Sequence, residues 1–310
     1  MKTLVVGANG MLGTDLVAEL EKRSHKTTAV DVHDLDITDP TAVARIGAGE
    51  FGDLDWCLNC AAYTAVDKAE SEPDLATLVN GVAPAYLGQA CAMQGIRLLH
   101  VSTDFVFDGE ASKPYFETAP TNPMGAYGRS KLAGESAVRE SGADALIVRT
   151  AWLYGPNGGS FPKTMIKAWL AGKTLKVVGD QTGTPTYTAD LARVMVDLAE
   201  RSPEAGIYHA AGPDIVTWHE LALRAIKAYK ELDNGIPEVN HGDHRKPMPG
   251  LFLHSKLCSG TQKPQKKESP DMLPPLWPSL RPASGASKTS GPRPYWSLGP
   301  VWSLPWSLYW

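Results

Sequence analysis

Short apolar runs alternate with amphipathic segments along the first 150 residues of the chain. The runs are typical of buried β-strands, and the segments, with apolar residues three or four positions apart, are typical of helices with one buried face. The expected strands are residues 2–6, 27–30, 55–59, 97–102 and 145–149. The expected helices are residues 11–22, 41–46, 75–93 and 128–141. This alternation predicts an α/β fold, a doubly wound parallel sheet with helices on both faces.

The composition of the 310-residue chain changes at about residue 250. Residues 251–310 contain five of the nine tryptophans and ten of the 24 prolines, with seven basic and two acidic residues, a net charge of +5. The first 250 residues carry 23 basic and 32 acidic residues, a net charge of −9. We expect residues 251–310 to be an irregular, poorly ordered tail. It is either a Pro/Trp-rich interaction segment or, as we favour, the product of a change of reading frame near residues 248–251.

Charge and cysteine content exclude several broad classes. The overall charge of −4 disfavours a general surface for nucleic acid or anionic membranes. Four cysteines do not make a disulfide scaffold and fit a reducing compartment. The chain has no apolar run of about 20 residues, and its N-terminal apolar run leads directly into a glycine-rich turn, unlike a signal peptide. We therefore expect a cytoplasmic protein with a small-molecule substrate.

The first predicted strand opens into the glycine-rich segment 7–13 (Gly-Ala-Asn-Gly-Met-Leu-Gly), directly before the first predicted helix. Gly7 permits a tight turn there, Gly10 lets the backbone approach a pyrophosphate, and Gly13 permits close packing of the helix. The helix N terminus adds N–H donors and a positive potential. The spacing GxxGxxG in this context predicts a dinucleotide site, and a plain strand–helix turn is the alternative. The residues expected to contact the cofactor here are Gly7, Asn9, Gly10, Met11, Leu12 and Gly13.

Asp31 ends the second predicted strand, where a carboxylate can accept hydrogen bonds from the adenosine ribose. No arginine follows directly to hold a 2′-phosphate, which favours NADH over NADPH. Asp36 and Ile37 follow shortly after and are candidates for the border of the adenine site. The alternative for this segment is an N-cap at Asp39 for the next helix.

Tyr127 and Lys131 form the sharpest chemical signal in the chain. They lie four positions apart at a predicted helix and therefore share one face. An ammonium near a phenol is expected to lower the tyrosine pKa, and it can also hold a ribose hydroxyl. Residues 102–104 (Ser-Thr-Asp) lie at the carboxyl end of a predicted buried strand, the edge where open α/β sheets bind ligands. A hydroxyl there can hydrogen-bond a substrate carbonyl while Tyr127 donates a proton.

Six segments carry a resemblance to known proteins: residues 7–13, 59–70, 101–109, 127–131, 149–155 and 180–186. Together they resemble the extended short-chain dehydrogenase/reductases and, within these, the dTDP-4-dehydrorhamnose reductase family. The stretch of residues 62–70 (Ala-Tyr-Thr-Ala-Val-Asp-Lys-Ala-Glu) separates this family from sugar epimerases and dehydratases. The resemblance extends over about residues 1–245.

The resemblance implies reduction of the C4 keto group of dTDP-4-dehydro-β-L-rhamnose to dTDP-L-rhamnose, with NADH or NADPH as the cofactor. It also implies an NAD(P)-binding Rossmann domain of residues 1–150, to which residues 187–205 return. A small, discontinuous sugar-nucleotide domain would consist of residues 151–186 and 206–250. The family normally ends with a further helix that packs on the substrate domain, and the tail has no such helix in its sequence pattern. Without that helix, apolar side chains of the substrate domain would be uncovered, and each large one would lose about 1.5–3 kcal/mol of stabilisation. We therefore expect low activity for this chain.

The resemblance also implies roles for individual side chains. The catalytic trio would be Thr103, Tyr127 and Lys131. The residues lining the nicotinamide side of the cofactor groove would be Ala61, Ala62 and Tyr63. The substrate contacts would be Thr64, Val66, Thr103, Asp104 and Trp152. Trp152 would pack its ring over the deoxysugar, and a place in the hydrophobic core is the alternative for it.

Two other functions stay open: an NAD-dependent sugar-nucleotide epimerase, and a non-catalytic, dinucleotide-binding regulatory subunit like that of methionine adenosyltransferase. Cys57 and Cys60 have CxxC spacing, but strand alternation places them on opposite faces, which disfavours a zinc site or a redox pair. His100 is interpreted as a hydrogen-bonded core residue, and His241 and His244 belong to no recognisable ligand set. We assign no metal ligand, although some family members depend on Mg²⁺, and we expect a monomer or a homodimer.

Overall fold

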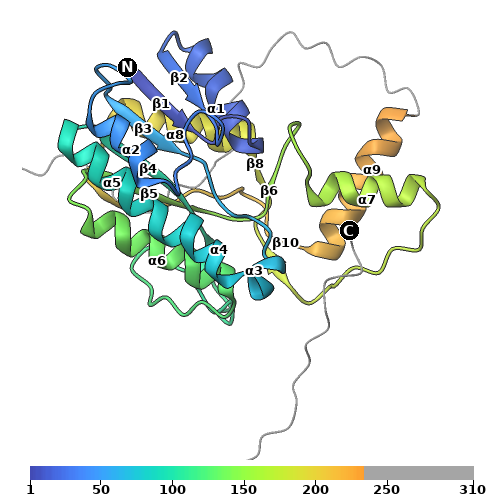
Figure 1. Cartoon of the computed structure of the whole chain (residues 1–310). Helices are drawn as coiled ribbons and strands as arrows, with labels where there is room; N and C mark the ends of the chain where they lie inside the picture. Colours follow the sequence, from blue (N-terminus) through green and yellow to red (C-terminus); the bar gives the residue numbers. More distant parts are fainter. Residues whose placement is uncertain (234–310) are drawn as a thin grey trace, which may run out of the picture. The chain divides into compact units, whose positions relative to one another are not determined.

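Six parallel strands form the central sheet of the computed structural model, in the order β2-β1-β3-β4-β5-β9 (Figure 1). They are β1 (Lys2–Val6), β2 (Lys26–Val30), β3 (Trp56–Asn59), β4 (Arg97–Thr103), β5 (Ala145–Thr150) and β9 (Gly206–His209). The structure describes residues 1–233, which all belong to one compact unit. The strand order reverses between β1 and β3, and α/β sheets bind ligands at the carboxyl ends of strands beside such a reversal. The predicted α/β doubly wound fold is therefore confirmed.

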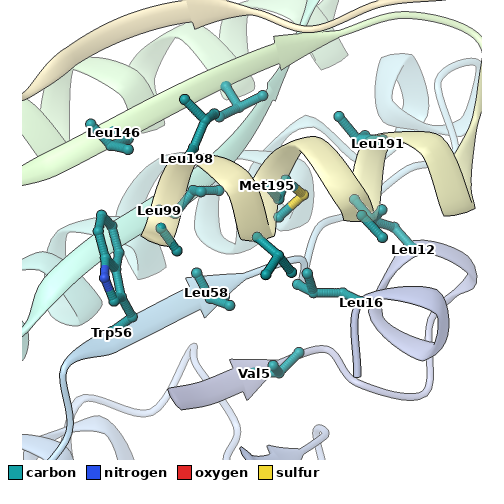
Figure 2. Close-up of a cluster of buried hydrophobic side chains, with 14 of the residues drawn as sticks. Val5, Leu12, Leu16, Trp56, Leu58, Leu99, Leu146, Leu191, Met195 and Leu198 are labelled. Atoms are coloured by element: carbon teal, nitrogen blue, oxygen red, sulfur yellow. The ribbon is translucent and has the colours of Figure 1, made fainter. Parts of the chain in front are cut away.

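Helices cover both faces of this sheet. One face carries α1 (Met11–Lys22) and α8 (Thr188–Arg201), and the other carries α2 (Pro40–Gly47), α5 (Ala83–Gln94) and α6 (Ala126–Glu140). Figure 2 shows the first face, where leucines of α1 and α8 pack onto apolar side chains of the strands. The buried residues labelled there are Val5, Leu12, Leu16, Trp56, Leu58, Leu99, Leu146, Leu191, Met195 and Leu198. Each such side chain contributes about 1.5–3 kcal/mol on burial, so this core holds α1, and the glycine loop before it, against the sheet.

The helix predicted for residues 75–93 is confirmed, but it contains a π-helical turn that the sequence pattern did not predict. The chain forms α4 (Pro73–Thr77), a π-helical turn η1 (Leu78–Val82) and then α5. Pro84 lies in the first turn of α5, where its missing N–H removes a helical hydrogen bond. Asn80, inside η1, is buried and bonds the backbone of Tyr63 in both directions. The helix therefore runs without a break from Pro73 to Gln94, and the π-helical turn within it coincides with the Asn80 contact and precedes Pro84.

The remaining elements are short strands and helices. The strands are β6 (Leu153–Tyr154), β7 (Thr182–Gly183), β8 (Thr186–Tyr187) and β10 (Val216–Thr217), and they pair as β6–β8 and β7–β10. The helices are α3 (Lys68–Ser71), the 3-10 turn η2 (Asp104–Val106), α7 (Phe161–Leu170) and α9 (Trp218–Asp233). Trp169 of α7 packs against Tyr229 of α9. The domain boundaries stay a prediction, and the predicted tail and both histidines near residue 241 lie outside the described residues.

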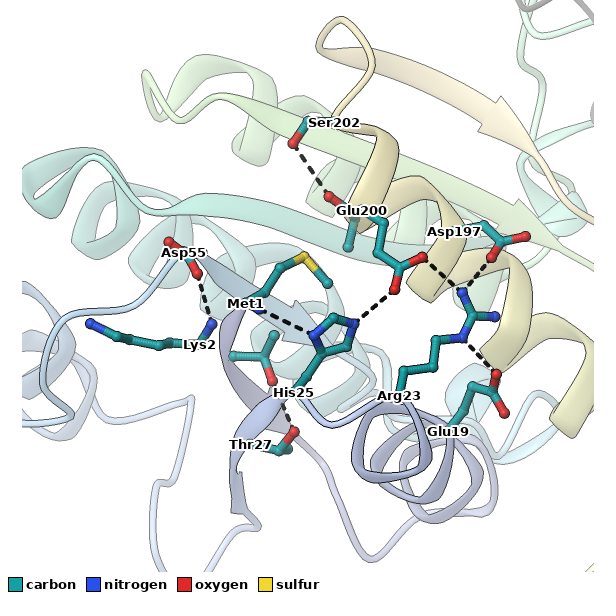
Figure 3. A network of polar contacts seen from close by, with 12 residues as sticks. Met1, Lys2, Glu19, Arg23, His25, Thr27, Asp55, Asp197, Glu200 and Ser202 are labelled. Carbon is teal, nitrogen blue, oxygen red and sulfur yellow. Dashed lines mark hydrogen bonds and ion pairs between the residues drawn. The ribbon is translucent and has the colours of Figure 1, made fainter.

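A polar network joins α1 to α8 at the opposite edge of the sheet from the glycine loop (Figure 3). Arg23 bonds Glu19 at 2.8 Å, Asp197 at 2.6 Å and Glu200 at 2.9 Å. His25 extends the network from Glu200 to the N-terminal amino group. These contacts tie the C-terminal end of α1 to α8, so that the helix behind the glycine loop is held at both ends. None of the helices described is both long and apolar enough to cross a bilayer.

Candidate active site

The glycine loop lies at the reversal of strand order, where the carboxyl ends of β1 and β3 meet. Gly7 has a φ of +76°, and a Cβ added to it would lie 2.7 Å from the backbone nitrogen of Ala61. A Cβ on Gly13 would overlap the carbonyl oxygen of Gly7. Helix α1 begins at Met11, and no side chain caps its N terminus. A turn this close to the next strand, followed by an uncapped helix N terminus, fits a dinucleotide pyrophosphate.

Replacing Gly13 by alanine is expected to weaken dinucleotide binding. The added methyl group pushes α1 away from Gly7, and such overpacking costs about 1–3 kcal/mol. A cost of 1.4 kcal/mol corresponds to about a tenfold rise in Kd. Fluorescence titration of the protein with NADH measures this change. The matched control is Gly179→Ala, since a Cβ at Gly179 meets nothing closer than 3.9 Å and should leave the Kd unchanged. Equal Kd values for the two variants would contradict the prediction.

Asp31 lies beside the glycine loop. Its Oδ2 accepts a hydrogen bond from the backbone N–H of Asn9 at 2.9 Å. The predicted alternative at Asp39 is confirmed, because its side chain accepts from the N–H of Thr41 at 2.8 Å and caps α2. Asp36 is exposed and accepts from Thr38, whereas Ile37 is buried in the core. A ligand at this border can therefore meet the exposed Asp36 carboxylate, whereas Ile37 is almost entirely covered.

Thr103, Tyr127 and Lys131 meet at the carboxyl end of β4. The Lys131 side chain is 2% exposed, and its ammonium donates to the carbonyl oxygen of Val101 at 2.7 Å. The Thr103 hydroxyl lies beside the Tyr127 side chain, donates to Asp104 Oδ1 at 3.1 Å and accepts from the backbone N–H of Phe105 at 3.2 Å. The structure thus brings together the three side chains that the sequence singled out, at the predicted edge of the sheet.

The expectation that Lys131 lowers the pKa of Tyr127 is wrong. Burial raises the pKa of Tyr127 to about 12, and the hydrogen bond with Thr103 only partly offsets this rise. Burial also lowers the pKa of Lys131 to about 8, against the opposing charge of Glu135. Loss of solvation therefore outweighs the neighbouring charges at both residues. A phenol with such a pKa keeps its proton at neutral pH, which suits a proton donor. Burial likewise raises the pKa of Asp104 to about 6.

A buried ion pair between α6 and β5 lies next to this site. Glu135 lies one helical turn after Lys131 and forms two bonds to the Arg149 guanidinium, at 2.8 and 2.7 Å. The two side chains are 1% and 4% exposed. Ser102 donates to the same carboxylate at 2.6 Å, and the ring of Phe107 lies 5.0 Å from the guanidinium carbon. The sequence interpretation missed this pair, although an arginine inside a buried strand was a signal that it needed a partner.

The segment after β3 is held by buried amides. The N–H of Ala61 donates to Asn59 at 3.0 Å, and the N–H of Tyr63 donates to Asn80 at 2.9 Å. The Tyr63 hydroxyl donates to Glu72 at 2.8 Å. Asn80 was also missed by the sequence interpretation, although an asparagine in an Ala/Leu-rich helix is a signal for a tertiary hydrogen bond. The neighbouring predicted contacts Ala62 and Val66 are half-buried and Thr64 is exposed.

Trp152 stacks on Trp218, with ring centroids 3.6 Å apart and planes 10° apart. Its φ of +44° is unusual for a residue with a side chain, and a Cβ on Gly183 would overlap its indole ring. The ring is half-buried, so it is not part of the hydrophobic core, and the structure does not support that alternative. Its packing over a sugar stays a prediction.

The predicted placement of Cys57 and Cys60 on opposite faces of the sheet, and of His100 in the core, is confirmed. Cys57 packs into the cluster on one face of the sheet, and Cys60 packs into the cluster on the other. His100 is buried and its Nδ1 lies 3.0 Å from the Asn59 amide, but its Nε2 has no partner in the described part of the chain. Residues 1–233 contain no group of three or more His, Cys, Asp or Glu side chains able to hold a metal ion.

Comparison with known proteins identifies the family. The model of the RmlD substrate binding domain matches residues 1–249. The chain belongs to this family. It is 47% identical to dTDP-4-dehydrorhamnose reductase of Streptomyces griseus, over 71% of this chain and 73% of that protein. The end of the match coincides with the change in composition near residue 250.

Two solved structures are similar in fold and sequence. The dTDP-4-dehydrorhamnose reductase of Clostridium acetobutylicum is 41% identical with a TM-score of 0.71, over 74% of this chain and 81% of that one. The enzyme of the same name from Bacillus anthracis, in complex with NADP, is 37% identical with a TM-score of 0.71, over 74% and 82% of the two chains.

Proposed function

We propose that this chain reduces the C4 keto group of dTDP-4-dehydro-β-L-rhamnose to the alcohol of dTDP-L-rhamnose, with a reduced nicotinamide dinucleotide as co-substrate. Its membership of the family and the names of its relatives support the substrate. The observation that carries the chemistry is the meeting of Thr103, Tyr127 and Lys131 at the end of β4, close to a glycine loop that fits a dinucleotide.

Each of these residues has a separate role in the proposed carbonyl reduction. The bound nicotinamide supplies a hydride to the carbonyl carbon. Tyr127 holds its proton at neutral pH and donates it to the oxygen that becomes the alcohol. Thr103 hydrogen-bonds that same oxygen. The Lys131 ammonium would hold the nicotinamide ribose by donating hydrogen bonds to its hydroxyls.

We propose NADH as the preferred form of the cofactor. Residues 31–39 contain Asp31, Asp34, Asp36 and Asp39 and neither lysine nor arginine. A 2′-phosphate placed beside these carboxylates would meet repulsion. We expect kcat/KM for NADH to exceed that for NADPH by about tenfold or more, which corresponds to about 1.4 kcal/mol. Equal values in initial-rate assays would contradict this preference.

A coupled assay tests the function. The 4-dehydrorhamnose substrate is made in situ, loss of NADH is followed at 340 nm, and the product is identified by mass spectrometry. Stoichiometric NADH consumption with formation of dTDP-L-rhamnose is the expected result. Sugar isomerisation without net NADH consumption would indicate the epimerase instead. Dinucleotide binding without turnover, together with capture of a methionine adenosyltransferase, would indicate the regulatory subunit.

Two further expectations belong to the same proposal. The partner is a small nucleotide sugar, bound by a chain that is a monomer or a homodimer. The donor set around the site gives no support to a Mg²⁺ requirement, because the described residues form no cluster of metal ligands.

A further inference from the structure

The helix that carries Tyr127 and Lys131 begins against a side chain from another helix. Glu70, on α3, accepts a hydrogen bond at its Oε1 from the backbone N–H of Ala126 at 2.6 Å. Ala126 is the first residue of α6, directly before Tyr127. The free N–H groups of a helix N terminus need acceptors, and a negative charge there is stabilising. Glu70 therefore supplies both an acceptor and a charge to the turn that holds the proton donor.

Helix α6 has no such group of its own. Its N-cap residue is Gly125, which makes no side-chain cap, and its first turn contains no acidic residue. A Cβ added to Gly125 would lie 2.9 Å from Glu70 Oε1. The Glu70 carboxylate thus occupies the space that a side chain at position 125 would need. Arg129 is the other charged group near this carboxylate, with Nη2 at 3.9 Å from Oε2.

The same turn of α6 packs against η2, the turn that directly follows Thr103. A Cβ on Gly128 would overlap the carbonyl oxygen of Phe105, so α6 and η2 touch backbone to backbone. The rings of Phe105 and Tyr127 meet edge to face, 5.5 Å between centroids. Two contacts therefore hold the backbone around Tyr127, one on η2 and one on Glu70.

We propose that Glu70 is a positioning residue for proton donation: it caps α6 from α3 and holds Tyr127 in register with Thr103. This role rests on the proposed reductase function. It also links the catalytic helix to the segment 61–66, which leads into α3 and is expected to contact cofactor and substrate. Glu70 acts through the backbone of α6 and touches neither substrate nor cofactor.

A pair of substitutions separates this role from a general structural one. Glu70→Ala removes the cap and is expected to lower kcat about tenfold, with KM for NADH changed less than twofold. In Glu70→Ala/Gly125→Ser, the serine hydroxyl supplies a local cap, because the φ of −109° and ψ of 166° at Gly125 suit an N-cap residue. We expect this double variant to recover at least half of the lost kcat. Gly125→Ser alone is expected to lower kcat, since its Cβ meets the Glu70 carboxylate.

The control is Glu50→Ala, because Glu50 is as exposed as Glu70 and also lies beside an arginine, but on the surface near α2. Its kcat should equal that of the parent chain. An unchanged kcat for Glu70→Ala, or a double variant no better than Glu70→Ala, would overturn the proposal.

Hydrogen exchange gives a readout that does not need turnover. The amides at the start of α6 should exchange faster in Glu70→Ala and return to parent rates in the double variant. If the parent chain lacks reductase activity but these exchange rates follow the expected pattern, the capping contact stands and the proposed function fails. Unchanged exchange in Glu70→Ala would show that Glu70 does not hold α6.

Discussion

Replacement of Tyr127 by phenylalanine is expected to lower kcat of the proposed reduction by a factor of about 10²–10⁴, the usual contribution of a positioned proton donor. The Tyr127 hydroxyl lies beside Thr103 at the end of β4, and burial raises its pKa to about 12, so it carries a proton throughout the neutral range. Phenylalanine keeps the ring that packs against Phe105 and loses only the oxygen. Dinucleotide affinity should therefore stay within about twofold of the parent value, on the same reasoning that only the proton transfer is removed.

The measurement combines initial rates of NADH loss with a fluorescence Kd for NADH. Tyr86→Phe is the matched control, since Tyr86 packs against the core on α5 and has no role in the site. Its kcat should equal that of the parent chain. A Tyr127→Phe protein that turns over substrate at the parent rate would remove Tyr127 from the mechanism and with it the proposed division of roles.

Replacement of Arg149 by leucine is expected to cost about 3–5 kcal/mol of unfolding free energy, because it removes the guanidinium that pairs with the buried Glu135 carboxylate and leaves Lys131 as its nearby cation. Glu135 is 1% exposed and keeps only the bond from Ser102 once the guanidinium is gone. The same change also removes the cation from above the ring of Phe107. Replacing both partners, as Arg149→Leu/Glu135→Leu, should cost less than Arg149→Leu alone, since the carboxylate that the single change leaves without its guanidinium is then absent.

Urea unfolding of the variants measures these differences. The control is Arg224→Leu, whose exposed pair with Asp214 at 3.3 Å contributes about 0–1 kcal/mol. Equal losses for Arg149→Leu and Arg224→Leu would show that the buried pair does not hold the sheet to α6. A double variant less stable than Arg149→Leu would show that the two charges are not coupled.

Local pattern sufficed for most of the fold. The predicted strand 2–6 and helix 11–22 coincide with β1 and α1, and the other strands agree within one residue at each end. Strands that are buried on both faces appear in the sequence as short apolar runs, here ending in Gly, Asp or Asn, and so their positions can be read from local residues alone. The predicted helix 75–93 is present, but its π-helical turn at residues 78–82 was not predicted, and Asn80 in that turn bonds Tyr63, 17 residues away.

The chemistry of the candidate site divides in the same way. The glycine loop, the Tyr127/Lys131 spacing and the hydroxyl of Thr103 were determined by the sequence alone, because each depends on residues within one turn or at the end of one strand. Only the tertiary structure decided the rise in the pKa of Tyr127, the Glu135–Arg149 pair and the capping of α6 by Glu70. Each of these depends on burial or on atoms that folding brings together from separate elements, 14 residues apart in the ion pair and 56 in the cap. Solvation and long-range contact, unlike local periodicity, exist only once the chain has folded.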